Sequence, residues 1–214
     1  MLSYALTTAT RLSNYMGISV PTGVTLSAME RMIDAVTTFV ENYTGRRFKK
    51  TVYTQEEYDT EEAETLNLKH LPVVAGQAFT LERRNSGLNE DDWETVDSQY
   101  YHVDRETGMI EFADGITLSR RRKGYRVTYT AGYDFDNATT FLSDTEAGDV
   151  ELAVWMLMEG LWNKRKGGSG ISHESIGDYS VTYRKELMEN EDLQAILDKY
   201  ATLDTIGVIT PFQS

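Results

Sequence analysis

The hydrophobic period of this chain changes twice, and this double change constrains the fold more than any other feature. Apolar residues recur at helical spacings up to about residue 50, form short strand-like runs from 51 to 133, and then return to the helical period. A helical pattern does not suit a strand, so we expect a β unit inserted into a helical chain. The predicted fold class is therefore α+β, with a helical core at 1–50 and 134–202, an inserted β domain at 51–133 and a tail at 203–214.

The helical part is predicted to be a small bundle. Its four helices are expected near residues 8–16, 27–44, 146–166 and 186–201. Ser27 and Glu30 form a candidate capping box for the second helix, and Gly45 marks its end. The third helix is apolar on more than one face, which predicts burial on two sides and a contact with another subunit.

The inserted part holds six short strand candidates with turn residues between several of them. They are Val52–Tyr53, Leu66–Leu68, Phe79–Leu81, Tyr101–Val103, Met109–Phe112 and Tyr125–Tyr129. Short strands at this spacing are typical of small antiparallel folds. We therefore predict an antiparallel unit that resembles a sandwich or a barrel.

The charge and cysteine content exclude several classes of protein. A formal net charge of −13 argues against tight, sequence-independent DNA binding, although DNA could still pass such a surface. The chain has no cysteine, so it has neither disulfides nor thiolate metal sites. No signal peptide and no apolar run of membrane-spanning length is present, so we expect a soluble protein without membrane contact.

The residues that carry chemistry do not form a recognisable site. None of the histidines shares a metal-ligand spacing; they are His70, His102 and His173. Asp134–Asn137 begins like a calcium loop, but Thr139 and Thr145 replace the required Gly and Glu. Gly167–Gly170 lacks the lysine of a phosphate loop. We predict no catalytic residue, no metal and no cofactor, and a small hydrolase or nuclease stays the enzymatic alternative.

Basic side chains gather in three clusters on this acidic chain. The candidates for contact with DNA or an acidic partner are Arg46, Arg47, Arg121, Arg122, Lys164, Arg165 and Lys166. Solubility, and for the last three residues complementarity to the dipole at the end of a helix, is the alternative explanation of these clusters, and the sequence favours it. A nucleic-acid-binding module is a further alternative, which the sequence pI of about 4.7 disfavours.

The segment after the third helix has the pattern of a strand that follows a hinge. Gly167–Gly170 forms the flexible joint, and Tyr179, Val181 and Tyr183 alternate with polar residues. An unpaired strand of this kind can add to the sheet of another chain. The segment therefore favours assembly rather than catalysis.

The order of several short motifs resembles one known family. The motifs are the pair Gly17–Ile18, Tyr43–Phe48 (Y-T-G-R-R-F), Val127–Tyr133 (V-T-Y-T-A-G-Y) and Ser172–Tyr183, with its S-I-G-D core. Together they resemble the head–tail connector (adaptor) proteins of long-tailed double-stranded DNA phages, over nearly the whole chain. The acidic stretch at 54–64 and the tail beyond Tyr200 depart from that pattern.

The resemblance implies a structural protein of the virion neck that is assembled in the host cytoplasm. Such a protein forms a ring, expected to be dodecameric, beneath the portal protein, and it meets a stopper or tail-side neck protein while double-stranded DNA passes through. A stopper or tail-completion protein is the alternative within phage assembly. The candidate contacts with the next subunit or the portal are Trp155, Trp162, Ile171, Ile176, Tyr179, Val181, Tyr183, Leu193, Tyr200 and Phe212.

Overall fold

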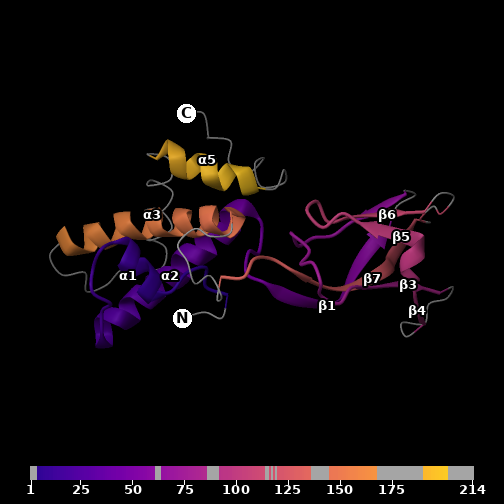
Figure 1. The fold of residues 1–214 in the computed structure, drawn as a ribbon, viewed down its shortest axis with the longest axis horizontal. Helices are drawn as coiled ribbons and strands as arrows, with labels where there is room; N and C mark the ends of the chain where they lie inside the picture. The colour runs from indigo at the N-terminus through magenta and orange to yellow at the C-terminus, as the bar shows by residue number, and fades with distance from the viewer. Residues whose placement is uncertain are drawn as a thin grey trace. The chain divides into compact units, whose positions relative to one another are not determined.

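The computed structural model confirms an α+β fold of helices and antiparallel sheets (Figure 1). It describes residues 4–60, 64–85, 92–113, 116, 118, 120–135, 145–167 and 190–201. The chain divides into two compact units. Met1–Phe48 and Asp134–Ser214 make up the first, called the helical unit here, and Lys49–Tyr133 make up the second, called the β unit.

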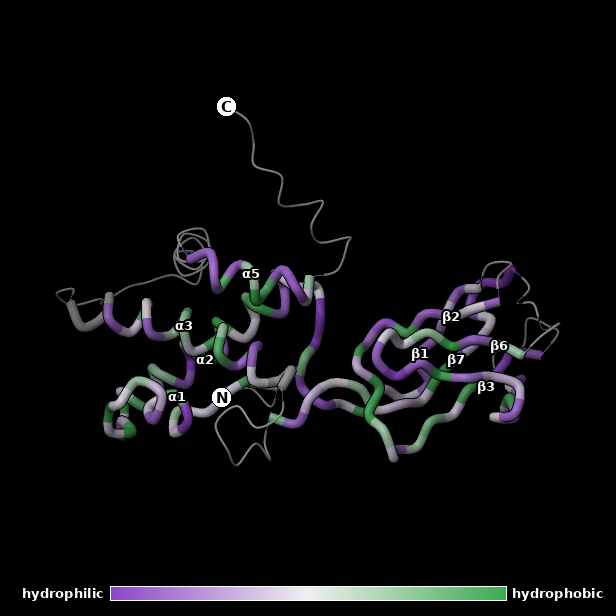
Figure 2. The backbone as a smooth tube through the Cα atoms, turned by 45° about the horizontal axis from the view of Figure 1, so that its top comes forward, coloured by the Kyte–Doolittle hydropathy of each residue, from purple (hydrophilic) through white to green (hydrophobic). Residues whose placement is uncertain are grey.

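The helical unit contains four helices in its described residues. They are α1 (Ala9–Tyr15), α2 (Gly23–Thr44), α3 (Thr145–Gly167) and α5 (Glu191–Tyr200). The long helix α3 lies between α5 on one side and α1 and α2 on the other (Figures 1 and 2). Asn190 caps α5, since its side chain accepts a hydrogen bond from the Leu193 backbone at 3.0 Å.

The two ends of α2 differ in how well the sequence predicts them. Gly45 ends the helix with a left-handed φ of 68°, as its position indicates. The capping box predicted at Ser27 is wrong, because the helix already begins at Gly23 with Thr22 as the extended N-cap. Ser27 lies inside the first turns, where its hydroxyl donates to the Gly23 carbonyl at 3.4 Å instead of capping a helix end.

The core of the helical unit is built around α3. Its apolar side chains are buried nearly all the way round, because α1, α2 and α5 supply apolar partners from the same chain. The buried apolar residues of α3 are Val150, Ala153, Val154, Trp155, Leu157, Met158, Leu161 and Trp162. Met29, Ile33, Val36 and Val40 of α2 and Leu193, Leu197 and Tyr200 of α5 complete this core.

The β unit consists of two antiparallel sheets. The first has the order β1 (Thr51–Thr60), β7 (Arg121–Ala131), β3 (Thr80–Arg84), β4 (Trp93–Thr95). The second has the order β2 (Thr65–Asn67), β6 (Met109–Phe112), β5 (Tyr101–Val103), and a 3₁₀ turn at Ser98–Tyr100 precedes β5. The sheets are not closed into a barrel, so only the sandwich-like form of that expectation matches.

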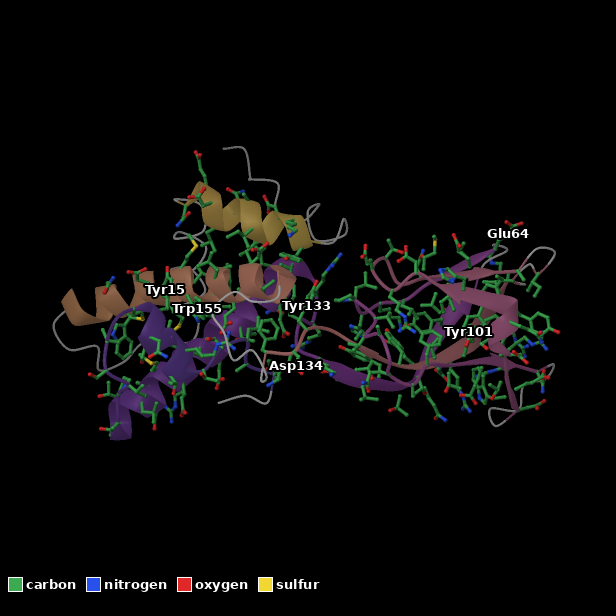
Figure 3. The ribbon with its side chains drawn as sticks, in the orientation of Figure 1. Tyr15, Glu64, Tyr101, Tyr133, Asp134 and Trp155 are labelled. Carbon is green, nitrogen blue, oxygen red and sulfur yellow. The ribbon has the colours of Figure 1, made fainter. Side chains whose placement is uncertain are left out.

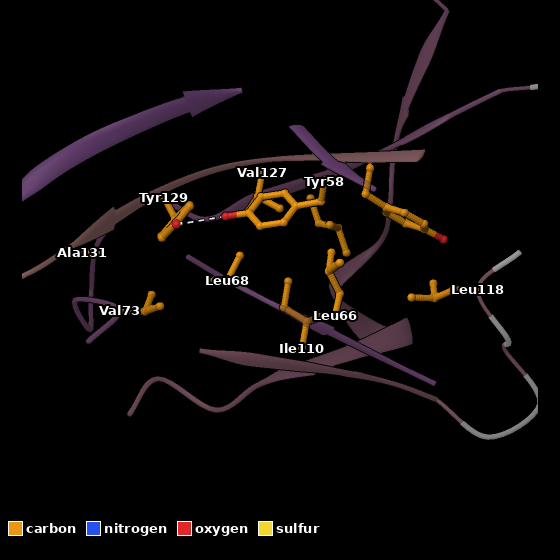
Figure 4. Close-up of a cluster of buried hydrophobic side chains, with 11 residues drawn as sticks. Tyr58, Leu66, Leu68, Val73, Ile110, Leu118, Val127, Tyr129 and Ala131 are labelled. Carbon is orange, nitrogen blue, oxygen red and sulfur yellow. Dashed lines mark hydrogen bonds between the residues drawn. The ribbon is translucent and has the colours of Figure 1, made fainter. Parts of the chain in front are cut away.

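One hydrophobic cluster joins the two sheets of the β unit (Figure 4). The alternate residues Tyr125, Val127, Tyr129 and Ala131 of β7 all enter it, as the period of a half-buried strand requires. Leu66 and Ile110 of the second sheet face them across the cluster. The interior of the unit is therefore a packed core that holds the sheets face to face.

Candidate assembly surfaces

The predicted contact residues on α3 and α5 belong to the subunit's own core. Trp155 is only 1% exposed; its indole nitrogen donates to the Thr7 hydroxyl at 2.8 Å and its ring stacks on Tyr15 (Figure 3). Trp162, Leu193 and Tyr200 are buried as well. Packing within the chain thus explains why α3 is apolar on more than one face. The assignment of these four residues to a subunit interface stays a prediction.

Six predicted contact residues lie outside the described part of the chain. They are Ile171, Ile176, Tyr179, Val181, Tyr183 and Phe212. The same holds for the side chains of Lys164, Arg165 and Lys166, whose backbone forms the last turn of α3. The role of the strand-like segment after α3 therefore also stays a prediction.

Two of the predicted basic contacts are used inside the subunit. The Arg47 guanidinium pairs with the buried carboxylate of Glu41 and lies over the Tyr4 ring at 5.2 Å. Burial raises the pKa of Glu41, and the nearby Arg47 only partly offsets this effect. The Arg121 guanidinium donates to the carbonyl oxygens of Arg84, at 2.9 Å, and Asn85, at 2.7 Å.

The other two described basic candidates are available to a partner. Arg46 is half-buried and Arg122 is exposed, and neither makes an ion pair with another described residue. Each follows or borders a regular element, Arg46 after the end of α2 and Arg122 within β7. The basic clusters thus contain residues that pair inside the subunit and residues that stay available to a partner. The sequence pattern alone does not distinguish the two groups.

A buried ion pair in the helical unit was not expected from the sequence. The Glu151 carboxylate on α3 is 3% exposed; it pairs with Arg11 of α1 and accepts a 2.7 Å hydrogen bond from the Thr7 hydroxyl. Arg11 also donates to the Phe135 carbonyl at 3.1 Å. Burial raises the pKa of Glu151, and the bonds from Thr7 and Arg11 offset part of that rise. This network ties α1 to the start of α3.

The β unit has a polar cluster around Glu56. Its Oε2 accepts hydrogen bonds from the hydroxyls of Tyr58 and Tyr129, and its Oε1 lies 3.3 Å from His70 Nε2 and 3.6 Å from Lys69 Nζ. Burial alone would raise the pKa of Glu56, but the two phenol bonds and the neighbouring cations lower it overall. Because four neighbours hold this carboxylate, it has the character of a structural group and not of a catalytic base.

Replacing Tyr129 by phenylalanine is expected to destabilise the β unit by about 1–2 kcal/mol, since Glu56 loses a donor and the His70 amide loses its acceptor at 3.3 Å. The lowered pKa of Glu56 means that its stabilisation is present above the unfolded pKa and is lost as pH falls through the folded pKa. This loss should be smaller in Y129F. Urea unfolding between pH 3 and 7 measures both effects.

Tyr125 provides the matched control for that substitution. It lies on the same strand at similar depth, and burial raises its pKa, but its hydroxyl makes no hydrogen bond within the described residues. Y125F should therefore change stability by less than Y129F and leave the pH dependence unaltered. Equal effects of the two substitutions would show that the Glu56 cluster contributes nothing specific.

The described residues contain no cluster of metal-ligating side chains. Within the same residues, no helix is both long and apolar enough to span a bilayer. The described residues form a separate core in each unit, and a buried ion pair between Arg11 and Glu151 braces α1 against α3.

Comparison with known proteins identifies the family. The chain belongs to the head completion protein family, whose model matches residues 5–203. It is thus a structural protein of the virion's head–tail neck, which confirms the resemblance to phage connector proteins. No curated protein sequence matches the chain.

Two solved structures share the fold. One is a chain from the neck of an empty gene transfer agent particle, computed with C6 symmetry; the TM-score is 0.55 at 13% identity over 91% of this chain and 88% of that chain. The other is a chain from the virion of a native gene transfer agent particle, with a TM-score of 0.51 at 14% identity over 95% and 93% of the two chains. At these identities the likeness concerns the fold.

Proposed function

We propose that this protein is a head–tail adaptor, which forms a closed ring beneath the portal, joins the capsid to the tail and completes the DNA channel without catalysing a reaction. The observation that carries the proposal is the family match, which extends over residues 5–203 and so includes both units. The similar fold in a neck that was computed with C6 symmetry supports a ring arrangement. The proposed number of copies, twelve, comes from the resemblance to phage connectors.

In this proposal the helical core, 1–50 and 134–202, builds the ring, and the β domain, 51–133, lies at its periphery. The portal contacts one side of the ring, and a stopper or tail-side neck protein contacts the other. The tail at 203–214 and the segment around Ile171–Tyr183 are proposed to reach these neighbours. Assembly would take place in the host cytoplasm, before the tail joins.

The charge of the chain supports passage of DNA instead of its capture. A ring of copies that each carry a net charge of −13 is strongly acidic, so it repels the phosphate backbone at long range. Among the basic residues predicted as contacts, Arg46 and Arg122 are the described ones that make no ion pair with another described residue, and we propose them for local contacts with DNA or with an acidic neighbour. Local contacts of this kind would guide the DNA without holding it.

Mass measurement of the full chain, alone and mixed with purified portal rings, tests the proposal. We expect a complex whose mass equals one portal ring plus a fixed number of copies, near twelve. A chain that never joined the portal but bound tail-side neck proteins would support the stopper alternative instead. DNA cleavage that a single carboxylate substitution abolishes would support the enzymatic alternative.

A further inference from the structure

The connection between α1 and α2 is the least charged part of the chain. Residues 12 to 29 contain no Asp, Glu, Lys or Arg, the longest such run in a protein in which 26% of residues are charged. This run includes the end of α1, the connection from Met16 to Thr22 and the first turns of α2. We call the residues from Val20 to Ala28 the uncharged tip.

The uncharged tip projects from the packed core of the helical unit. The first buried residue of α2 is Met29, so the preceding turns of the helix bury no side chain fully. Val24 is 86% exposed and Val20 is 41% exposed. The start of α2 points away from α3 and α5 and is coloured in green and pale tones without the deep purple of charged residues (Figures 1 and 2).

Little within the described part of the chain stabilises these first turns as a helix. Thr22 occupies the N-cap position but its side chain makes no capping hydrogen bond, and the first turn has no acidic residue. Gly23, Val24 and Thr25 are poor helix formers, and Gly23 has a left-handed φ of 58°. Val20 and Val24 are thus exposed apolar side chains within the longest uncharged run of the chain, and the combination of exposed apolar surface with depleted charge is what the core of an interface shows.

We propose that the uncharged tip is a contact between neighbouring copies of this chain, with Val20 and Val24 packed against the adjacent subunit. Two copies that each carry −13 repel one another at long range, so a contact between them costs least where acidic side chains are absent. Depletion of charge is also what distinguishes the core of a protein interface. A basic partner would instead be attracted to the acidic faces of the chain, so the tip fits a second acidic copy best. This inference rests on the proposed ring.

The substitution Val24→Asp tests the contact. Wild-type chain must first form rings, alone or on portal rings; if it does not, the proposed function fails and the tip is not the cause. Given wild-type rings, V24D should require at least a tenfold higher concentration to assemble, measured by native mass spectrometry. V24L should assemble like wild type. The melting temperature of the V24D monomer should not fall, because the side chain is almost fully exposed and a carboxylate in the first turn of a helix is favourable.

Two further variants keep the test specific. V52D introduces the same charge at another exposed valine, on β1 of the β unit, and should leave ring formation intact. T22D places a capping carboxylate at the start of α2; it should raise the melting temperature of the monomer and still weaken assembly. Thus T22D separates assembly from folding.

Three outcomes would overturn the proposal. V24D could form rings at the wild-type concentration, which would show that the tip is not buried between copies. V24D and V52D could weaken assembly equally, which would make the added charge and not its position responsible. V24D rings could form normally yet lose the portal or the tail-side protein, which would assign the tip to a different partner.

Discussion

Replacing Arg11 by alanine is expected to lower the free energy of unfolding of the helical unit by about 3 kcal/mol. The substitution leaves the Glu151 carboxylate, which is 3% exposed, without its cation; among the described residues, the Thr7 hydroxyl is then the one side chain that donates to it. Loss of one member of a buried pair costs about 3–5 kcal/mol. The lower figure applies because the Arg11 side chain is 20% exposed. Urea unfolding followed by helical circular dichroism measures the change.

The effect of the Arg11 substitution should depend on pH in a defined direction. Burial raises the pKa of Glu151 in the folded chain, and removal of Arg11 raises it further. A carboxyl group with a raised pKa favours folding below its unfolded pKa, and this contribution is lost as pH rises through the folded pKa. The R11A defect should therefore be largest at neutral pH and smaller in mild acid.

Two variants serve as controls for this pair. Arg31 is an exposed arginine on α2, and R31A should change the free energy of unfolding by less than about 0.5 kcal/mol. The double variant R11A/E151Q removes the buried charge and should lose the added pH dependence. A pH-independent defect in R11A would show that lost packing of the arginine stem, and not the stranded carboxylate, causes the destabilisation.

The fold class could be predicted because it depends on local periodicity. The spacing of Met29, Ile33 and Val36 defines a helix, and the alternation of Tyr125, Val127 and Tyr129 defines a strand, without knowledge of their partners. The helix end at Gly45 could be predicted for the same reason. The start of α2 could not, since its first turns lack both a cap and an apolar face.

The internal roles of the charged residues could not be predicted, because their partners are distant in sequence. Glu151 stands near the start of a helix, where an acidic residue is expected for the dipole alone, and Arg11 lies 140 residues before it. Arg46 and Arg47 are adjacent in sequence, yet only Arg47 reaches a buried carboxylate. The side-chain directions that decide this follow from the tertiary packing.

The apolar residues on all sides of α3 were the sequence feature most open to two interpretations, burial within the chain or burial against another subunit. A helix that is apolar all round must be covered, but the pattern does not say whether the cover comes from the same chain or another. Here α1, α2 and α5 supply it, and Trp155 and Trp162 are buried within one subunit. The exposed apolar residues Val20 and Val24 lie where the sequence showed no amphipathic pattern at all, and absence of charge was the only available signal.

Replacing Trp155 by alanine is expected to destabilise the helical unit by about 3–5 kcal/mol, among the largest effects of any single substitution in this chain. The side chain is 1% exposed, stacks on Tyr15 with ring centroids 5.1 Å apart and donates to Thr7, which in turn donates to Glu151. Truncation therefore opens a cavity and also removes a bond that holds Thr7 toward the buried carboxylate. Both consequences fall on the junction of α1 and α3.

Hydrogen exchange resolved along the chain is the appropriate measurement, since two units with separate cores need not unfold as one. In W155A, exchange should accelerate in α1, α2 and α3 while β7 keeps its wild-type protection. Trp93 offers the matched control: its side chain is half-buried, and the Arg84 and Arg126 guanidiniums lie 4.7 and 4.6 Å from its ring centroid. W93A should accelerate exchange in the β unit alone, and by less than W155A does in the helical unit. Equal acceleration of exchange in β7 and in α3 would show that the two cores unfold together. The β unit would then not be an independently folding unit.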